Sequence, residues 1–117
     1  MLYEIRNYHY DPEYWEEYKK WAVEKAVPFF RSRWDLVGAW LKNDTPAIYG
    51  GSLPKDDSIT PANLTWIIRW KDMDHRNKAW EDIVKTKEWE ELFSTVPGGT
   101  KSYLRTEAKF AEEIYNR

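Results

Sequence analysis

The chain has 117 residues, a net charge of −2 and 17% aromatic residues, which predicts one domain over residues 1–117 and no basic footprint for nucleic acid. The absence of cysteine excludes disulfides, a thiol nucleophile and thiolate metal sites. The sequence has no apolar stretch of about 18 residues that could span a membrane and no signal-peptide pattern at residues 1–10, so we expect a cytoplasmic protein without membrane contact.

The first elements in chain order are a strand and a helix. Residues 2–8 alternate between two faces, as in a β-strand. Asp11 and Pro12 then predict a helix start, with Asp11 as the N-cap and Pro12 at the first helical position. Pro28 is expected to kink this helix or divide it in two. The apolar residues of the helix share one arc, which predicts that it lies on a sheet: Tyr14, Trp15, Tyr18, Trp21, Ala22, Ala26 and Phe29.

Two further strands are predicted at residues 36–42 and 63–71, separated by a long segment at about 43–62. This segment contains Gly50-Gly51 and three prolines, and it is too long for a plain hairpin turn. Loops of this length are often lids or dimer arms. The strand at 63–71 is the most apolar, and its even-numbered residues form one face: Leu64, Trp66, Ile68 and Trp70.

A second helical region begins at Asp72 or Asp74 and ends at Pro97-Gly98-Gly99, and a last strand covers residues 101–109. The order strand, helix, two strands, helix, strand predicts an α+β, ferredoxin-like βαββαβ fold. In that fold, a four-stranded antiparallel sheet carries its helices on one face and leaves the other face uncovered.

The uncovered face predicts self-association. Strand alternation assigns apolar Leu36, Trp40, Ile67 and Tyr103 to it, which favours a homodimer formed through the sheet face. The same alternation is expected to place five charged residues on this face, as an ion-pair network or an anion site: Glu4, Arg6, Arg69, Arg105 and Glu107.

Several segments resemble the NIPSNAP family, over about residues 2–110. They are the first strand at 3–8, the helix segment at 27–30, the strand at 36–40, Ile68-Arg69-Trp70, Trp80 and Lys87-Glu88-Trp89. The resemblance implies the dimeric α/β-barrel superfamily, and the segment at about 43–62 is longer than in small bacterial members. That superfamily hosts monooxygenases, isomerases, decarboxylases and non-enzymatic binders, so the fold does not fix the function.

A candidate catalytic group is Asn7, His9 and Trp80. Alternation is expected to place Asn7 and His9 on the helix side of the sheet, with Trp80 approaching from the second helix. The resemblance implies that Asn7 and Trp80 stand where monooxygenases of this superfamily use an Asn and a Trp. His9 would then transfer protons. The haem-degrading members need a later His, and residues 77–117 contain none, so no cofactor is expected.

Four further residues are candidates for substrate binding: Trp66 and Trp70 as pocket walls, and Tyr14 and Lys25 at the rim. Aromatic walls with a few polar groups are typical of small-molecule sites. The alternatives are that the Trp residues fill a core and that Lys25 only covers aromatic rings with its stem. His75 beside Asp72 and Asp74 is a common pattern of a solvated helix start, and no metal site is expected.

These observations predict a protein that binds a small apolar or aromatic molecule between sheet and helices. The enzymatic interpretation is a cofactor-independent monooxygenase or isomerase. The alternative is a non-enzymatic homodimeric binding or scaffold protein whose long loop is its partner surface.

Overall fold

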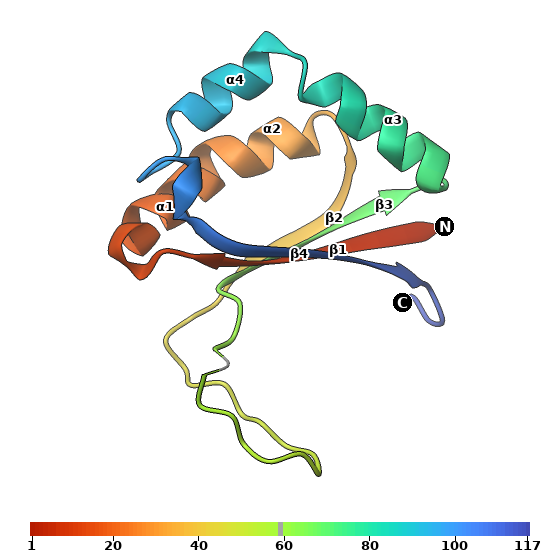
Figure 1. Ribbon diagram of the computed structural model, residues 1–117. Helices are drawn as coiled ribbons and strands as arrows, with labels where there is room; N and C mark the ends of the chain where they lie inside the picture. The colour runs from red at the N-terminus through yellow and green to blue at the C-terminus, as the bar shows by residue number, and fades with distance from the viewer. Residues whose placement is uncertain (59) are drawn as a thin grey trace.

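The computed structural model describes residues 1–58 and 60–117 and confirms the predicted α+β fold (Figure 1). Its four strands form one antiparallel sheet in the order β2-β3-β1-β4, so β1 and β3 are central. The helices cover one face of this sheet, as a ferredoxin-like arrangement requires. The strands are β1 Leu2–Tyr10, β2 Asp35–Leu41, β3 Leu64–Trp70 and β4 Tyr103–Glu112.

The first helical region confirms both sequence signals. The Asp11 carboxylate accepts a hydrogen bond from the Glu13 backbone N–H at 2.9 Å and so caps the first turn. Pro28 has no N–H to donate, and the preceding segment is a π-helix in which Val27 N–H donates to Ala22 O. The region comprises a 3-10 turn at Pro12–Tyr14, α1 Trp15–Trp21, the π-helix Ala22–Ala26 and α2 Val27–Arg31.

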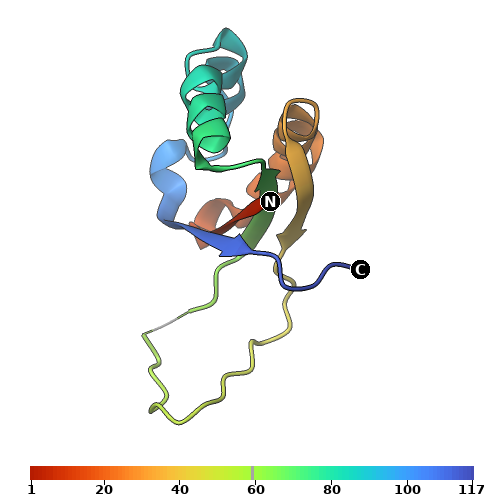
Figure 2. The same cartoon turned by 90° about the vertical axis from the view of Figure 1, so that its right-hand side faces the viewer.

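The second helical region consists of α3 Met73–Ile83 and α4 Lys87–Ser94, followed by a 3-10 turn at Thr100–Ser102. Asp72 caps α3 and Thr86 caps α4, each through its side-chain oxygen. The pair α3 and α4 stands beside α1 and α2 on the same side of the sheet (Figure 2). The space between the sheet and these two helical regions holds the buried side chains.

The pairing register corrects the predicted faces of β1. Glu4 lies opposite Ile68 and Arg6 opposite Trp66, and paired residues share a face. Because Ile68 and Trp66 are buried under the helices, Glu4 and Arg6 are on the helix side as well. The prediction that Asn7 and His9 share the face of Trp66 is therefore wrong, since odd-numbered residues of β1 point to the open face.

The open face also differs from the prediction in part. Trp40 and Ile67 are on it, as expected, because they pair with residues of the open-face set. Leu36 and Tyr103 are not: both line the space under the helices. Bulges in β2 and β4 shift the alternation that a regular strand would have.

The predicted charged network is divided between the two faces. Arg69, Arg105 and Glu107 lie on the open face by register, and Arg69 pairs there with Asp35 at 2.7 Å. The other two predicted members, Glu4 and Arg6, lie under the helices. The five residues therefore do not form one network.

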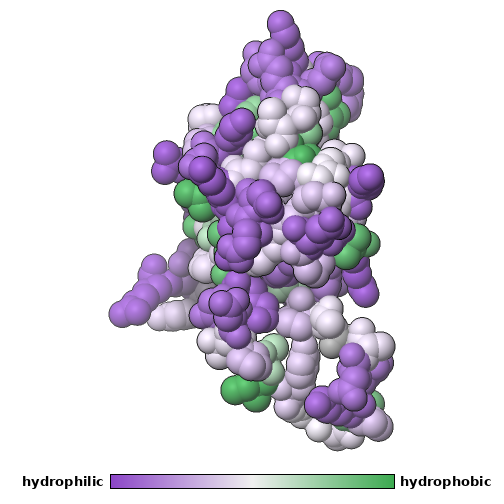
Figure 3. Space-filling view, turned by 90° about the vertical axis from the view of Figure 1, so that its left-hand side faces the viewer, coloured by the Kyte–Doolittle hydropathy of each residue, from purple (hydrophilic) through white to green (hydrophobic). Residues whose placement is uncertain are grey.

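Residues 42–63 connect β2 to β3, and the described part of this segment forms no helix or strand. The segment projects from the side of the sheet opposite the helices (Figures 1 and 2). Its apolar residues Ile48, Tyr49 and Leu53 are exposed. Figure 3 shows hydrophobic atoms on the surface of this segment, whereas the surface over the helices is mainly hydrophilic. This geometry fits an arm better than a lid over the space beneath the helices.

Candidate functional site

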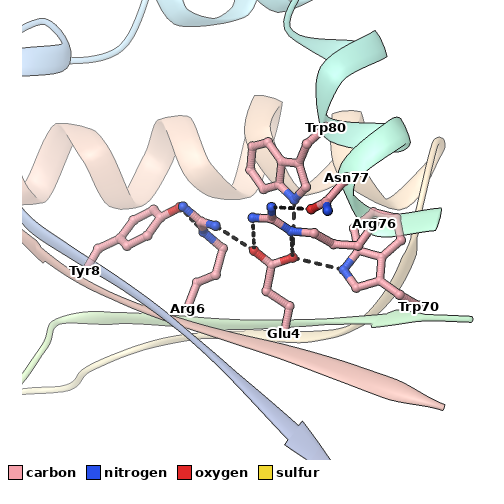
Figure 4. Close-up of polar contacts among 7 residues, drawn as sticks. All are labelled: Glu4, Arg6, Tyr8, Trp70, Arg76, Asn77 and Trp80. Carbon is pink, nitrogen blue, oxygen red and sulfur yellow. Dashed lines mark hydrogen bonds and ion pairs between the residues drawn. The ribbon is translucent and has the colours of Figure 1, made fainter. Parts of the chain in front are cut away.

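A fully buried carboxylate organises the helix side of the sheet (Figure 4). Glu4 Oε1 accepts hydrogen bonds from Trp70 Nε1 at 2.9 Å, Trp80 Nε1 at 3.2 Å and Arg76 Nε at 3.0 Å. Glu4 Oε2 accepts from Arg76 Nη2 at 3.0 Å and from Arg6 Nη1 at 2.6 Å. These five residues are called the Glu4 cluster below, and they join β1, β3 and α3.

The Glu4 cluster keeps its carboxylate ionised. Burial alone raises the pKa of Glu4, but hydrogen bonds from Arg76, Arg6 and Trp70 outweigh it and hold the pKa below its usual value of 4.5. With one carboxylate and two guanidinium groups, the cluster carries one surplus positive charge. A buried charge needs full pairing to be tolerated, and Glu4 has it.

Arg6 connects the Glu4 cluster to a pocket. Its Nε donates to the Tyr8 hydroxyl at 2.7 Å, and its guanidinium carbon lies 4.7 Å from the centre of the Trp80 ring. Figure 4 shows the guanidinium between Tyr8 and Glu4. Aromatic faces attract cations, so the rings hold Arg6 in this position.

The pocket has a volume of about 330 Å³ and lies between the sheet and both helical regions. Its wall is mainly aromatic and aliphatic, with polar groups from Arg6, three tyrosines and two threonines. The lining residues are Arg6, Tyr8, Tyr18, Trp21, Ala22, Ala26, Val27, Phe30, Leu36, Ala39, Leu64, Trp66, Trp80, Trp89, Phe93, Thr100, Tyr103 and Thr106.

The tyrosines of the wall are hydrogen-bond donors rather than bases. Burial raises the pKa of Tyr8, Tyr18 and Tyr103. The Tyr18 and Tyr103 hydroxyls are hydrogen-bonded to each other at 3.1 Å. These phenols therefore stay protonated near neutral pH.

Trp66 is the one buried indole of the wall whose N–H has no partner in the described part of the chain. The residue is only 6% exposed. Its ring meets the Tyr8 ring edge to face, with 6.2 Å between the ring centres. An unpaired buried donor is costly, and a bound acceptor would remove that cost.

The predicted substrate-binding and catalytic tryptophans are partly brought together. Trp66 and Trp80 both line the pocket, and their ring centres are 6.3 Å apart. Trp70 does not line it. Its indole instead holds Glu4, and its ring packs edge-on against Trp34.

Two predicted rim residues lie away from the pocket wall. Lys25 is exposed in the π-helix and is not among the residues that line the pocket. Tyr14 is half-buried at the start of the helical region, where its ring lies against Gly98, at φ +75°. A Cβ at Gly98 would come within 2.4 Å of this ring, so the turn needs glycine.

The predicted catalytic pair of β1 lies on the open face of the sheet. Thr65 Oγ1 donates to Asn7 Oδ1 at 2.6 Å, and His9 Nε2 lies 3.0 Å from Thr60 O. Both are on the other side of β1 from Trp80. The structure therefore does not bring Asn7 and His9 together with the pocket.

Sequence reasoning did not identify three residues of the Glu4 cluster, namely Glu4, Arg6 and Arg76, as part of the site beneath the helices. Strand alternation predicts Glu4 and Arg6 on the open face of the sheet, and it gives no signal that Arg76 binds Glu4. One signal was available: Glu4 and Arg6 are two positions apart on the same strand face as Leu2 and Tyr8. Opposite charges flanked by apolar residues on one face can indicate an ion pair buried with them.

Within residues 1–58 and 60–117, no group of three or more His, Asp and Glu side chains could hold a metal ion. His75 lies in the first turn of α3, where its backbone N–H donates to the capping Asp72 carboxylate at 2.8 Å and its ring Nδ1 accepts from the Lys71 backbone N–H at 3.1 Å. None of the described helices is long and apolar enough to span a membrane.

Solved structures share this fold. An uncharacterized NIPSNAP-domain protein from Burkholderia xenovorans is 18% identical, with a TM-score of 0.71 over 97% of this chain and 95% of that one. A NIPSNAP family protein from Agrobacterium tumefaciens is 13% identical, with a TM-score of 0.71 over 95% and 90%. A second from that organism, described as of unknown function, is 18% identical, with a TM-score of 0.70 over 95% and 86%.

Neither a protein-family model nor a curated protein matches the chain. The chain thus has the fold of solved NIPSNAP-domain proteins, which is the fold that the resemblance of the sequence segments implies. At these identities the comparison concerns the fold alone.

The Glu4 cluster predicts a specific acid sensitivity. Because the pKa of Glu4 is lower in the folded chain, its stabilising contribution is complete above pH about 4.5 and is lost as the pH falls through the folded-state value. We expect Glu4→Gln to lower the free energy of unfolding by about 3–5 kcal/mol at pH 7. The variant should also lose less stability than the wild type between pH 5 and pH 2 (about the range in which carboxylates titrate).

Urea unfolding at several pH values measures both effects. Asp35→Asn is the matched control, because its pair with Arg69 is half exposed and should cost no more than about 1 kcal/mol. Parallel acid profiles for the wild type and Glu4→Gln would contradict the assignment of a depressed pKa to Glu4.

Proposed function

We propose that the pocket between sheet and helices binds a small, largely apolar or aromatic molecule. The observation that carries this proposal is the pocket itself, with about 330 Å³ of space and a mainly aromatic wall. Ligand pockets in proteins measure about 300–1,000 Å³ and combine apolar walls with a few convergent polar groups. Arg6, Tyr8 and Trp66 supply those polar groups at one place in the wall.

Binding is favoured over catalysis by the residues of the wall. The described residues that line the pocket include no Asp, Glu or His, and the buried tyrosines are held protonated. A cofactor-independent monooxygenase or isomerase needs a group that removes a proton from its substrate. The wall offers donors that would orient a ligand, but no ready base.

Filling part of the pocket should weaken ligand binding. Ala39 lines the pocket from β2, whereas Val37 of the same strand is 47% exposed. Calorimetric titration with one- and two-ring aromatic compounds should detect binding to the wild type and to Val37→Phe. Ala39→Phe should weaken it about tenfold or more, a cost of about 1.4 kcal/mol. Equal affinity in both variants would place the ligand elsewhere, and no binding to the wild type would contradict the proposal.

A second candidate is a homodimer formed through the open face, which rests on a different observation. Trp40 is 52% exposed on this face, and the 42–63 segment projects beyond it with exposed Ile48, Tyr49 and Leu53. Exposed apolar surface of this kind is typical of an interface. A second copy on the open face would also be contacted by the projecting segment. This dimer is compatible with ligand binding, because the pocket lies on the other side of the sheet.

Sedimentation at several protein concentrations tests the dimer. The wild type should sediment at twice the 14.1 kDa of one chain, and Trp40→Glu should raise the dissociation constant about tenfold or more, because it buries an unpaired charge. Val23→Glu is the control, because Val23 is 61% exposed on the helix layer. A monomeric wild type would exclude this candidate.

A further inference from the structure

We propose that the ligand of this pocket is an aromatic or apolar anion, whose carboxylate-like group binds at Arg6, Trp66 and Tyr8. This inference rests on the proposed function and names its ligand class. It follows from the position of three polar groups in an otherwise apolar wall and from the charge beside them.

Arg6 has N–H groups that neither Glu4 nor Tyr8 uses. Its Nη1 binds Glu4 and its Nε binds the Tyr8 hydroxyl. The described residues offer no hydrogen-bond partner to its Nη2, although Arg6 lines the pocket. A guanidinium has five N–H groups in a planar fork, so an anion can bind Nη2 without displacing Glu4.

Glu4 does not neutralise the whole positive charge of Arg6 and Arg76 beside the pocket. Arg76 alone reaches both oxygens of Glu4, at 3.0 Å each, and Trp70 and Trp80 bind it as well. The carboxylate therefore remains satisfied if Arg6 turns toward a ligand. One surplus positive charge then remains beside the pocket, and none of the described lining residues is acidic.

The indole N–H of Trp66 has no hydrogen-bond partner within residues 1–58 and 60–117. It is buried and belongs to the pocket wall. The Trp66 ring meets the Tyr8 ring edge to face at 6.2 Å between centres, and the Arg6 guanidinium carbon lies 5.8 Å from the centre of the Trp66 ring. The Tyr8 oxygen accepts from Arg6, which leaves its own proton for donation. Arg6, Trp66 and Tyr8 thus present three donors to one place, where an oxygen anion could accept from all of them.

The experiment compares two ligands of nearly equal shape, 2-naphthoate and 2-naphthamide, by calorimetric titration. Charge-assisted hydrogen bonds are about twice as strong as neutral ones, so the wild type should bind naphthoate about tenfold or more tightly than naphthamide. Arg6→Gln should bind both with similar affinity. Trp66→Phe keeps the ring but not the N–H and should weaken naphthoate binding several-fold. Arg69→Gln, on the open face, should behave as the wild type.

Each outcome separates the two proposals. Binding of naphthamide as tightly as naphthoate would overturn the anion proposal and leave pocket binding intact. Failure of the wild type to bind either compound would overturn both. If Arg6→Gln does not fold, as judged by circular dichroism, Trp66→Phe decides, and an unchanged affinity for naphthoate would overturn the anion site.

Discussion

The ionised carboxylate of Glu4 is buried between the sheet and α3, and the donors that it requires position the elements around it. It lies on a central strand and is tied to β3 by Trp70 and to α3 by Arg76 and Trp80. An ionised group can be buried here only because donors surround it. The cluster thereby fixes where α3 lies on the sheet. It also fixes the wall of the pocket, because Trp80 belongs to both.

The polar groups of Arg6, Tyr8 and Trp66 lie at one place in the pocket wall, because Arg6 extends there from the Glu4 cluster. Half of the lining residues are aromatic, and their rings meet edge to face or at a tilt, such as Tyr8 with Tyr103 and Phe30 with Trp66. Aromatic pairs prefer such arrangements because of the charge distribution of their rings. The polar groups gather where Arg6 leaves the Glu4 cluster. An apolar cavity with donors at one place suits a ligand with an apolar body and a single acceptor group.

The order of elements could be predicted from the sequence because local signals decide it: the Asp11-Pro12 helix start, the change of helix type before Pro28 and the alternation of β3 all appear in the structure. The face of β1 could not. Both sets of alternate residues on β1 mix apolar and polar side chains, and a carboxylate at Glu4 argued against burial. Arg76, 72 residues away, reverses that argument, and no local pattern reports so distant a partner. Trp66, predicted as a wall residue, and Trp80, predicted as a catalytic residue, both line the pocket, whereas the other predicted wall residue, Trp70, does not. Asn7 and His9 lie on the opposite side of the sheet from the one predicted.

The NMR spectrum of the indole N–H groups in ¹⁵N-labelled protein, recorded with and without 2-naphthoate, tests both the Glu4 cluster and the anion site. The Trp70 and Trp80 signals should show slow hydrogen exchange in the free protein, because Glu4 accepts from both. The Trp66 signal, identified by its loss in Trp66→Phe, should then show the largest shift on adding naphthoate. A Trp66 signal that does not respond while naphthoate binds would rule out the anion site at Arg6, Trp66 and Tyr8.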